Sequence, residues 1–107
     1  MKTDRELLEL AAKAAGIKGK WSARGKCIVI SNGDGLSMHH WRPLEDDGDA
    51  LRLAVNLWFQ VTQSYCKDDL GYYAEVFGYC EYHNGDPASA TRRAITRAAA
   101  AIGEGME

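Results

Sequence analysis

The chain has 107 residues, of which 46% are hydrophobic and 26% are charged. This balance is typical of one soluble globular domain and excludes a disordered chain. The formal net charge of -2 lacks the basic excess of a dedicated nucleic-acid-binding protein, and it is too small for a wholesale acidic imitation of DNA. No apolar run approaches the roughly 20 residues that span a membrane, so we expect no membrane partner.

The three cysteines, Cys27, Cys66 and Cys80, form an odd set without a C-x-x-C pair. The beginning of the chain has no apolar core of the kind found in signal peptides. We therefore expect a soluble cytoplasmic protein whose cysteines are reduced.

The first predicted helix begins at Asp4, because the preceding Thr3 and the following Glu6 have the spacing of a capping box. Gly16 suits the position just past the end of this helix. Residues 17–24 form a basic segment around Trp21 that favours a loop or, at most, a short strand.

Residues 27–30 are rich in β-branched side chains and predict a strand. The following segment, residues 31–35, predicts a hairpin turn, with residues 36–41 as the return strand. The turn lacks the G-x-x-x-x-G-K pattern and no helix follows it immediately, so it is not a phosphate-binding loop.

Residues 41–57 are predicted to be a loop that delivers the central helix of the domain. The start of this helix is indicated by Pro43 and by an acidic cluster of Glu45, Asp46, Asp47 and Asp49. From Ala50 onward the apolar residues surround a single polar stripe, which predicts a mostly buried helix; the stripe consists of Asp49, Arg52 and Asn56. The carboxylates lack the ligand spacing of a calcium loop.

The remaining chain predicts a hairpin and a last helix. Residues 58–65 and 72–82 alternate as strands do, with a turn at 66–71 and a bend or bulge at Gly78. Asp86 and Pro87 indicate the start of a helix that runs to about Ile102 and is ended by Gly103, with the last few residues frayed.

The predicted order is therefore helix, two strands, helix, two strands, helix. We expect a single small α+β domain over residues 1–107, an α-β-β-α-β-β-α arrangement with an antiparallel sheet packed by helices.

No pattern in the sequence indicates catalysis. Cys80 and His83 are three residues apart, so they would face opposite sides of a strand and need a bulge or turn to meet one metal ion. No serine lies in a G-x-S-x-G elbow. Glu75 and Glu81 share a predicted strand face, but about 20 Å of extended chain separates them, too far for glycoside chemistry. We expect no enzyme, no bound metal and no cofactor.

The predicted strand 72–82 has two unlike faces. One carries three aromatic rings between charged residues, namely Tyr73, Glu75, Phe77, Tyr79, Glu81 and His83. The other is smaller and suits the alanine-rich last helix; it consists of Tyr72, Ala74, Val76, Gly78, Cys80 and Tyr82. An aromatic face is usually core. If the helix covers the smaller face, however, the aromatic face is left for a partner or ligand.

Arg92, Arg93 and Arg97 form the only basic cluster on a predicted helix. Guanidinium groups suit phosphates or carboxylates. The alternative is a solvated face, paired with Glu104 or with the acidic loop.

Residues 41–55 (W-R-P-L-E-D-D-G-D-A-L-R-L-A-V) and 90–103 (A-T-R-R-A-I-T-R-A-A-A-A-I-G) resemble segments of small phage and prophage proteins of unknown function. The two segments hold 29 of the 107 residues. The family begins its first segment with W-N-P-L, so Arg42 departs from the pattern. The resemblance implies a phage origin and action in the cytoplasm of a bacterial host, and it supplies no activity.

Small phage proteins without catalytic machinery often act by binding a host component, so counter-defence is the function class that we expect. The first hypothesis is sequestration of a nucleotide-derived immune signal by aromatic stacking and arginine contacts, with Trp41, Arg42, Tyr73, Tyr79, Arg93 and Arg97 as the ligand-binding residues. The alternative is an inhibitor of a host defence complex, comparable to an anti-CRISPR protein, that binds through an aromatic patch rimmed by charge. A role in DNA replication is disfavoured by the charge balance, and a homo-oligomer is compatible with both hypotheses.

Overall fold

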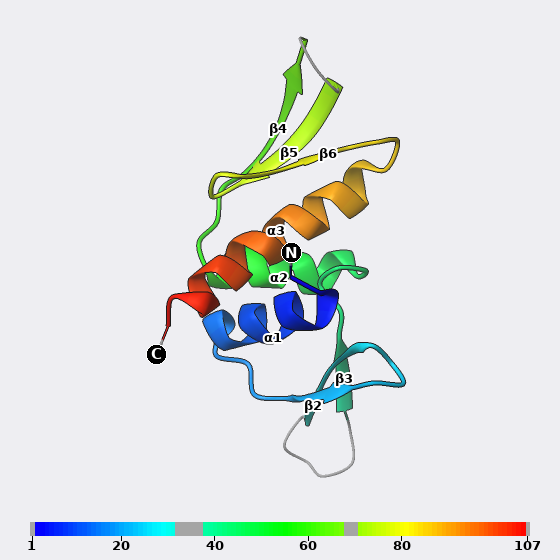
Figure 1. Ribbon diagram of the computed structural model, residues 1–107, viewed down its shortest axis with the longest axis vertical. Coiled ribbons are helices and arrows are strands. Elements are labelled where there is room, and N and C mark those ends of the chain that lie inside the picture. The colour runs from blue at the N-terminus through cyan, green and yellow to red at the C-terminus, as the bar shows by residue number, and fades with distance from the viewer. Residues whose placement is uncertain (1, 32–37, 68–70, 107) are drawn as a thin grey trace.

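The computed structural model describes residues 2–31, 38–67 and 71–106 and has an α+β architecture (Figure 1). These residues form three helices and two three-stranded antiparallel sheets. Along the chain the elements are α1 (Asp4–Ala15), β1 (Lys20–Ser22), β2 (Cys27–Ser31), β3 (Met38–Trp41), α2 (Asp47–Asn56), β4 (Val61–Cys66), β5 (Gly71–Val76), β6 (Tyr79–Tyr82) and α3 (Pro87–Glu104). The predicted fold class is confirmed, with one more strand in each half of the chain.

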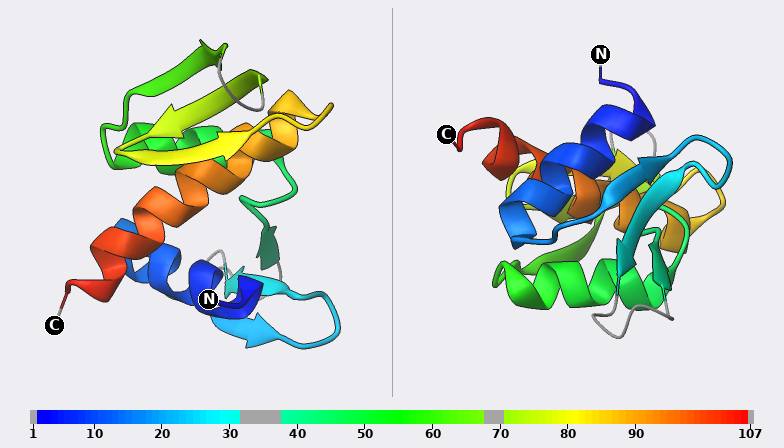
Figure 2. Two further views of the ribbon diagram at one scale, coloured as in Figure 1. Left: turned by 45° about the horizontal axis from the view of Figure 1, so that its top comes forward. Right: turned by 90° about the horizontal axis from the view of Figure 1, so that it is seen from below.

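The helices occupy the middle of an elongated molecule, and one sheet lies toward each end (Figures 1 and 2). The β1-β2-β3 sheet lies beside α1, and the β4-β5-β6 sheet lies over α3. The extents along the principal axes are 52 × 29 × 25 Å. Because α3 contacts α1, α2, β5 and β6, α3 holds the central position that the sequence assigned to the helix after Trp41.

The predicted ends of α1 are both present. The Thr3 hydroxyl accepts a hydrogen bond from the Glu6 backbone N–H at 3.2 Å, and the Thr3 backbone N–H donates to the Glu6 carboxylate at 3.1 Å. At the other end, Gly16 takes a left-handed backbone with φ of 73°. Local sequence chemistry therefore fixes this helix.

The start of α3 is also as predicted, but its end is not. The Asp86 carboxylate accepts from the Ser89 backbone N–H at 3.1 Å, and Pro87 is the first helical residue. The helix then continues through Gly103 to Glu104, so Gly103 does not terminate it. Its glycine has another cause: a Cβ atom at this position would lie 1.9 Å from the Leu10 carbonyl oxygen of α1.

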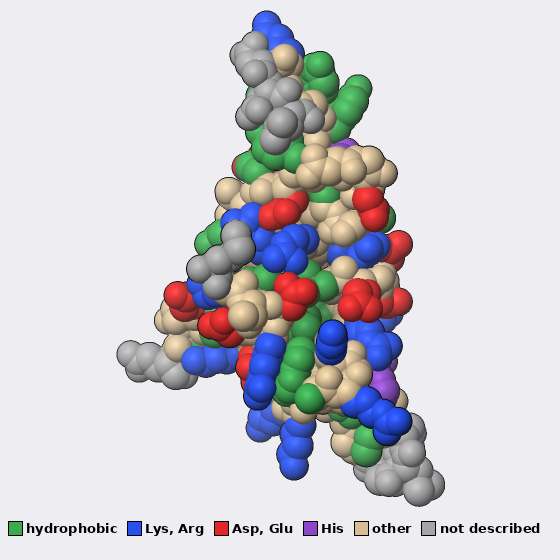
Figure 3. Space-filling model, turned by 45° about the vertical axis from the view of Figure 1, so that its right-hand side comes forward, with side chains coloured by type: hydrophobic (Ala, Val, Ile, Leu, Met, Phe, Trp, Pro, Cys, Tyr) green, Lys and Arg blue, Asp and Glu red, His purple; other side chains and the backbone are tan. Residues whose placement is uncertain are grey.

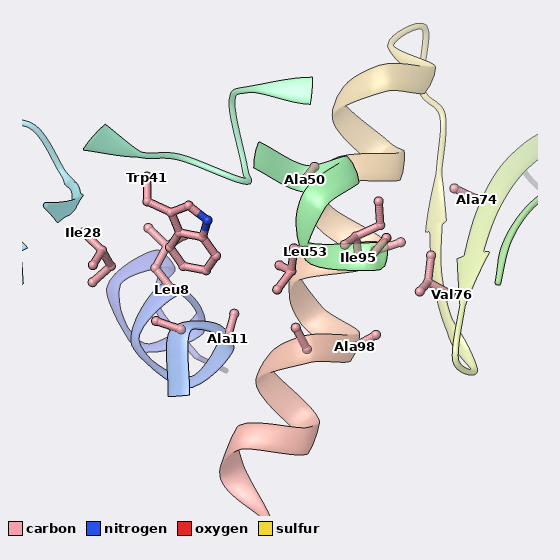
Figure 4. Close-up of a cluster of buried hydrophobic side chains, with 14 residues drawn as sticks. Leu8, Ala11, Ile28, Trp41, Ala50, Leu53, Ala74, Val76, Ile95 and Ala98 are labelled. Atoms are coloured by element: carbon pink, nitrogen blue, oxygen red, sulfur yellow. The ribbon is translucent and has the colours of Figure 1, made fainter. Parts of the chain in front are cut away.

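The core runs from one sheet to the other through the helices (Figure 4). Leu8 and Trp41 meet near β2, Leu53 and Ile95 fill the middle, and Val76 belongs to β5 of the second sheet. Between these larger side chains the helices make contact through alanines that have no exposed surface, among them Ala11, Ala94, Ala98 and Ala99. Small side chains let two helix backbones approach closely.

One predicted strand assignment needs correction, and one that the sequence left open is decided. The segment around Trp21, predicted to be a short strand or none, forms a strand at residues 20–22, paired with β2 in the register Trp21 to Ile28. Residues 58–60 are not a strand, because Trp58 has a left-handed backbone with φ of 60°. Residues 32–37, which contain most of the predicted first turn, and residues 68–70 of the second turn lie outside the described residues.

The predicted single strand over residues 72–82 is two strands. Phe77 and Gly78 form a tight turn with φ of 51° and 85°, and Val76 pairs with Tyr79 across it. Because Phe77 and Gly78 form the turn, the side chains after it lie on the opposite face from the one expected for a continuous strand. Ala74 and Val76 of β5 are buried on the side that packs on α3, as predicted for the smaller face, whereas Tyr79 and Glu81 of β6 lie on this same side.

The predicted burial of the helix after Trp41 is wrong in part. Ala50, Leu53 and Ala54 of α2 are buried, but Leu51 and Val55 are 62% and 67% exposed. Among the described residues, α3 is the element that packs most extensively on this helix, so α2 has one covered face. Its apolar residues are therefore divided between core and surface.

We predict that Gly103→Ala lowers the free energy of unfolding by about 2–3 kcal/mol, because the added Cβ would force α1 and α3 apart. Gly105→Ala is the matched control, since the nearest atom to its Cβ is the Ile102 carbonyl oxygen at 3.6 Å. That change should cost less than about 0.5 kcal/mol. Urea denaturation of both variants measures the difference, and equal stability would contradict the proposed close contact.

Candidate functional site

The structure brings together three of the six predicted ligand-binding residues. Tyr79, Arg93 and Arg97 line a cleft of about 380 Å³ between α1, α3 and β6, which we call the α3 cleft. Its other lining residues are Lys2, Leu7, Glu81, Ala100, Ala101 and Glu104. The Arg97 guanidinium lies over the Tyr79 ring, 5.2 Å from its centroid.

The other three predicted residues lie elsewhere. Trp41 is 4% exposed and belongs to the core, so its predicted ligand contact is not available in this fold. Tyr73 lies on the sheet face opposite to Tyr79 and contacts Tyr82, with 5.8 Å between ring centroids. Arg42 lines a different hollow, beside α1 and Trp21. The predicted six-residue site is therefore not one site.

The cations of the α3 cleft already have carboxylate partners. Arg97 forms an ion pair and hydrogen bond with Glu81, and Arg93 donates to Asp4 at 3.3 Å. Lys2 lies 2.5 Å from Glu104, and this partner raises the pKa of the Lys2 ammonium. An anionic ligand would have to displace these carboxylates.

Figure 3 shows acidic and basic side chains interspersed over the middle of one face. Arg92, the third arginine of α3, donates to Asp47 at 2.6 Å and to the Leu44 carbonyl at 3.0 Å. The pairing of Arg92 with the acidic loop is the alternative to a phosphate site that the sequence left open, but its side chain is 17% exposed and therefore not solvated.

A second polar cluster, which the sequence did not predict, surrounds Asp49. This carboxylate is 2% exposed and joins the end of β3 to the start of α2. It accepts hydrogen bonds from the Arg42 backbone N–H at 2.9 Å, from Arg52 at 2.9 Å and from His39 Nε2 at 2.8 Å. The sequence held a signal for the burial of Asp49, since the apolar stretch starts one residue after it, but its position at a predicted helix start accounted for the carboxylate as a capping residue.

The charge state of Asp49 follows from two opposing effects. Burial raises the pKa of the Asp49 carboxyl, but the hydrogen bonds from Arg42, Arg52 and His39 outweigh burial and lower the pKa below its ordinary value. The buried Asp49 carboxylate stays ionised and, through its three hydrogen-bond donors, holds the turn before α2 in place. Within the described residues, no group of three or more His, Cys, Asp or Glu side chains is arranged to hold a metal ion.

A third feature is an exposed apolar surface on and beyond α2. Leu51 and Val55 lie one turn apart on α2, and Trp58 follows just past the end of this helix; all three are exposed, Trp58 to 92%. Trp58 and Phe77, which is 66% exposed, both line a hollow of about 480 Å³ that also contains Phe59. We call these four exposed residues, Leu51, Val55, Trp58 and Phe77, the Trp58 surface.

Comparisons with protein families, with curated proteins and with solved structures give no match. In the described part of the chain, no helix has the length and apolar character required to cross a membrane. The structural features that bear on function are therefore the α3 cleft, the cluster around Asp49 and the Trp58 surface.

Two residues of the Trp58 surface, Trp58 and Phe77, have a left-handed backbone, which is strained for residues other than glycine. At the end of α2, Trp58 N–H donates to the Val55 carbonyl at 3.2 Å and Phe59 N–H donates to the Ala54 carbonyl at 2.9 Å. This is a Schellman ending, in which the left-handed position normally holds glycine. The same ending in α1 uses Gly16. In α2 the position holds a tryptophan with φ of 60°.

Phe77 repeats the pattern in the β5–β6 turn. Both central residues of this two-residue turn have positive φ, a geometry that favours Asn-Gly. Phe77 occupies the first position with φ of 51°, and its ring lies 5.7 Å from that of Phe59. Two aromatic side chains are thus displayed from left-handed backbone beside one hollow.

We predict that Asp49→Asn lowers the free energy of unfolding at pH 7 by about 2 kcal/mol, because it removes the charge that three donors stabilise. The folded-state pKa is lowered, so the stabilisation is complete above the unfolded-state pKa of about 3.9 and is lost as the pH falls through the folded-state value. The stability difference between wild type and variant should therefore shrink below about pH 4. Denaturant titrations from pH 7 to pH 2 measure it.

Asp47→Asn is the control for this experiment. Asp47 contacts Arg92 but its side chain is 78% exposed, so its loss should cost less than about 1 kcal/mol. A pH-independent cost of Asp49→Asn would argue that its role is packing rather than charge.

Proposed function

We propose that this chain is a phage accessory protein that acts by binding a host protein through the Trp58 surface. The observation that carries the proposal is the display of Trp58 and Phe77 on left-handed backbone, with most of each side chain in solvent. Left-handed backbone costs a residue other than glycine about 1–2 kcal/mol. Neither ring is buried deeply enough to offset this cost within the chain itself.

The composition of the Trp58 surface favours a protein partner. Tryptophan and other large rings are enriched among residues that dominate protein interfaces, and they act best when a polar rim surrounds an apolar centre. The hollow beside Trp58 combines both kinds of side chain, since Gln60, Thr62 and Glu75 line it together with the aromatic residues. The fixed helix ending holds Trp58 in place before a partner arrives, which reduces the entropy lost on binding.

The host context of the proposal rests on the resemblance of residues 41–55 and 90–103 to phage proteins. The first of these segments holds the buried face of α2 together with Leu51 and Val55. Inhibition of a host defence complex is the counter-defence mechanism that fits an exposed apolar surface, because such an inhibitor needs an interface and no catalytic group.

We predict that Trp58→Gly and Phe77→Asn separate binding from stability. Each substitution places a residue that tolerates the left-handed backbone, so the free energy of unfolding should be unchanged or should rise by about 1 kcal/mol. Binding to the host partner should weaken by a factor on the order of thirty, as expected for a central aromatic contact. Affinity capture from the bacterial host, followed by calorimetry with the purified partner, measures the effect.

Met38→Ser is the matched control, because Met38 is also an exposed apolar residue but lies in β3 of the other sheet. It should leave capture intact. A partner retained by Trp58→Gly, or lost equally with Met38→Ser, would show that the Trp58 surface is not the interface.

A second candidate function is sequestration of a nucleotide-derived signal in the α3 cleft. The specific support is the convergence of Tyr79, Arg93 and Arg97 with Lys2 around a volume of about 380 Å³, within the usual range of ligand pockets. Phosphate groups would replace Glu81, Asp4 and Glu104 as partners of these cations. The need to displace three carboxylates makes this the less favoured candidate.

We predict for this candidate that an ADP-ribose-type or cyclic nucleotide gives binding heat in calorimetry and that Arg97→Ala abolishes it. Arg5→Ala is the control, because Arg5 lies on α1 outside the cleft and pairs with Glu9. Absence of heat with every such nucleotide would remove the candidate. Trp58→Gly should leave nucleotide binding unchanged, so the two candidate functions are tested separately.

A further inference from the structure

The two sheets have four outer strands, and three of them are protected against further strand pairing. An exposed strand edge offers unpaired backbone N–H and carbonyl groups, which natural proteins protect with short strands, charged side chains or covering groups. β1 has three residues and carries Lys20, and β3 has four residues. On β6, Arg97 donates to the Cys80 carbonyl at 3.3 Å, and Glu81 adds a charge.

β4 is the exception among these strands. It has six residues, V-T-Q-S-Y-C, none of which is charged or a proline. It pairs with β5 on one side and with no other strand in the described parts of the chain. Figure 1 shows β4 at the outer side of its sheet. We infer that β4 pairs with the β4 strand of a second copy of this chain, so that two three-stranded sheets become one six-stranded sheet.

The side chains of β4 indicate the register of this pairing. A two-fold axis at Gln63 places Val61 of one copy opposite Tyr65 of the other, and Thr62 opposite Ser64. In antiparallel sheets, directly opposed residues lie on one face, and pairs of an aromatic with a β-branched residue are favourable. The strand is thus complementary to itself in this register, which is what a symmetric dimer requires.

The face that bears Val61 and Tyr65 is only partly covered by its own chain. In the register of β4 with β5, Val61 lies opposite Val76 and Tyr65 opposite Tyr72. Gln63, between them, donates to the Thr91 hydroxyl of α3 at 2.8 Å, and Val76 is buried, whereas Val61 and Tyr65 on the outer strand are 38% and 58% exposed. Figure 3 shows hydrophobic side chains gathered near this end of the molecule. Pairing with a second copy would cover both residues.

The composition of β4 meets the charge requirement of a second copy. Antiparallel self-pairing places identical sequences together, so any charged residue near the centre of the strand would meet a like charge in its mate. β4 has none, whereas β6 carries Glu81, and β1 and β3 are shorter strands of three and four residues. None of the paired positions is among the four residues of the Trp58 surface, although Thr62 also lines the hollow beside Trp58.

A charge-pairing experiment tests both the dimer and its register. In the double variant Val61→Lys and Tyr65→Lys, lysines would face lysines across the two-fold axis. In the double variant Val61→Lys and Tyr65→Glu, each lysine would face a glutamate. Sedimentation velocity over a concentration series should give twice the 11.8 kDa chain mass for wild type, the monomer mass for the first variant, and twice the chain mass again for the second.

Circular dichroism and thermal unfolding establish that both double variants are folded, which is expected because both positions are exposed. A wild-type protein that stays monomeric throughout would overturn the inference, as would a dimer that persists with two lysines. A monomeric second variant would overturn the register centred on Gln63. Loss of the dimer in Trp58→Gly alone would place the contact between copies on the Trp58 surface instead.

Discussion

The close approach of α1 and α3 is the constraint on which the rest of the structure depends. Where Gly103 passes the Leu10 carbonyl, no side chain fits between the two backbones. Helices this close bury small residues, so much of the middle of the core is alanine. β5 and β6 pack on one side of α3, and α2 packs on another side. Each sheet is left at one end of the molecule, attached through one face only (Figure 2).

A core built largely from alanines explains why several large apolar side chains remain exposed to solvent. With alanines filling the contacts between helices, the covered area can accommodate Trp41, Leu53 and Ile95 but not the rings beyond α2 or at the tip of the β4–β5 hairpin. The arginines of α3 show the opposite behaviour, since Arg92, Arg93 and Arg97 are each paired with a carboxylate.

Local rules of protein structure are broken at a few places, and several of these belong to the proposed interactions. A tryptophan and a phenylalanine occupy backbone positions that favour glycine or asparagine, and the longest edge strand carries no charge. Gly16 and Asn84 follow the rule at other left-handed positions, whereas Lys26, with φ of 52°, departs from it outside both proposed interfaces. Left-handed backbone alone therefore does not mark an interface; at Trp58 and Phe77 it coincides with large exposed rings.

The sequence by itself determined the elements that depend on neighbouring residues: both ends of α1, the start of α3, the strand after Cys27 and the α+β class. It could not decide which face of α2 is covered, that residues 72–82 turn back at Phe77, or that Asp49 is buried. Periodicity tells which residues share a face but not what packs on that face, and a two-residue turn reverses the assignment of every later side chain. The same limit applies to the site. Tyr79, Arg93 and Arg97 converge because α3 lies against β6, whereas Trp41 and Tyr73 are carried away from them by the packing of α1 and by the second face of the sheet.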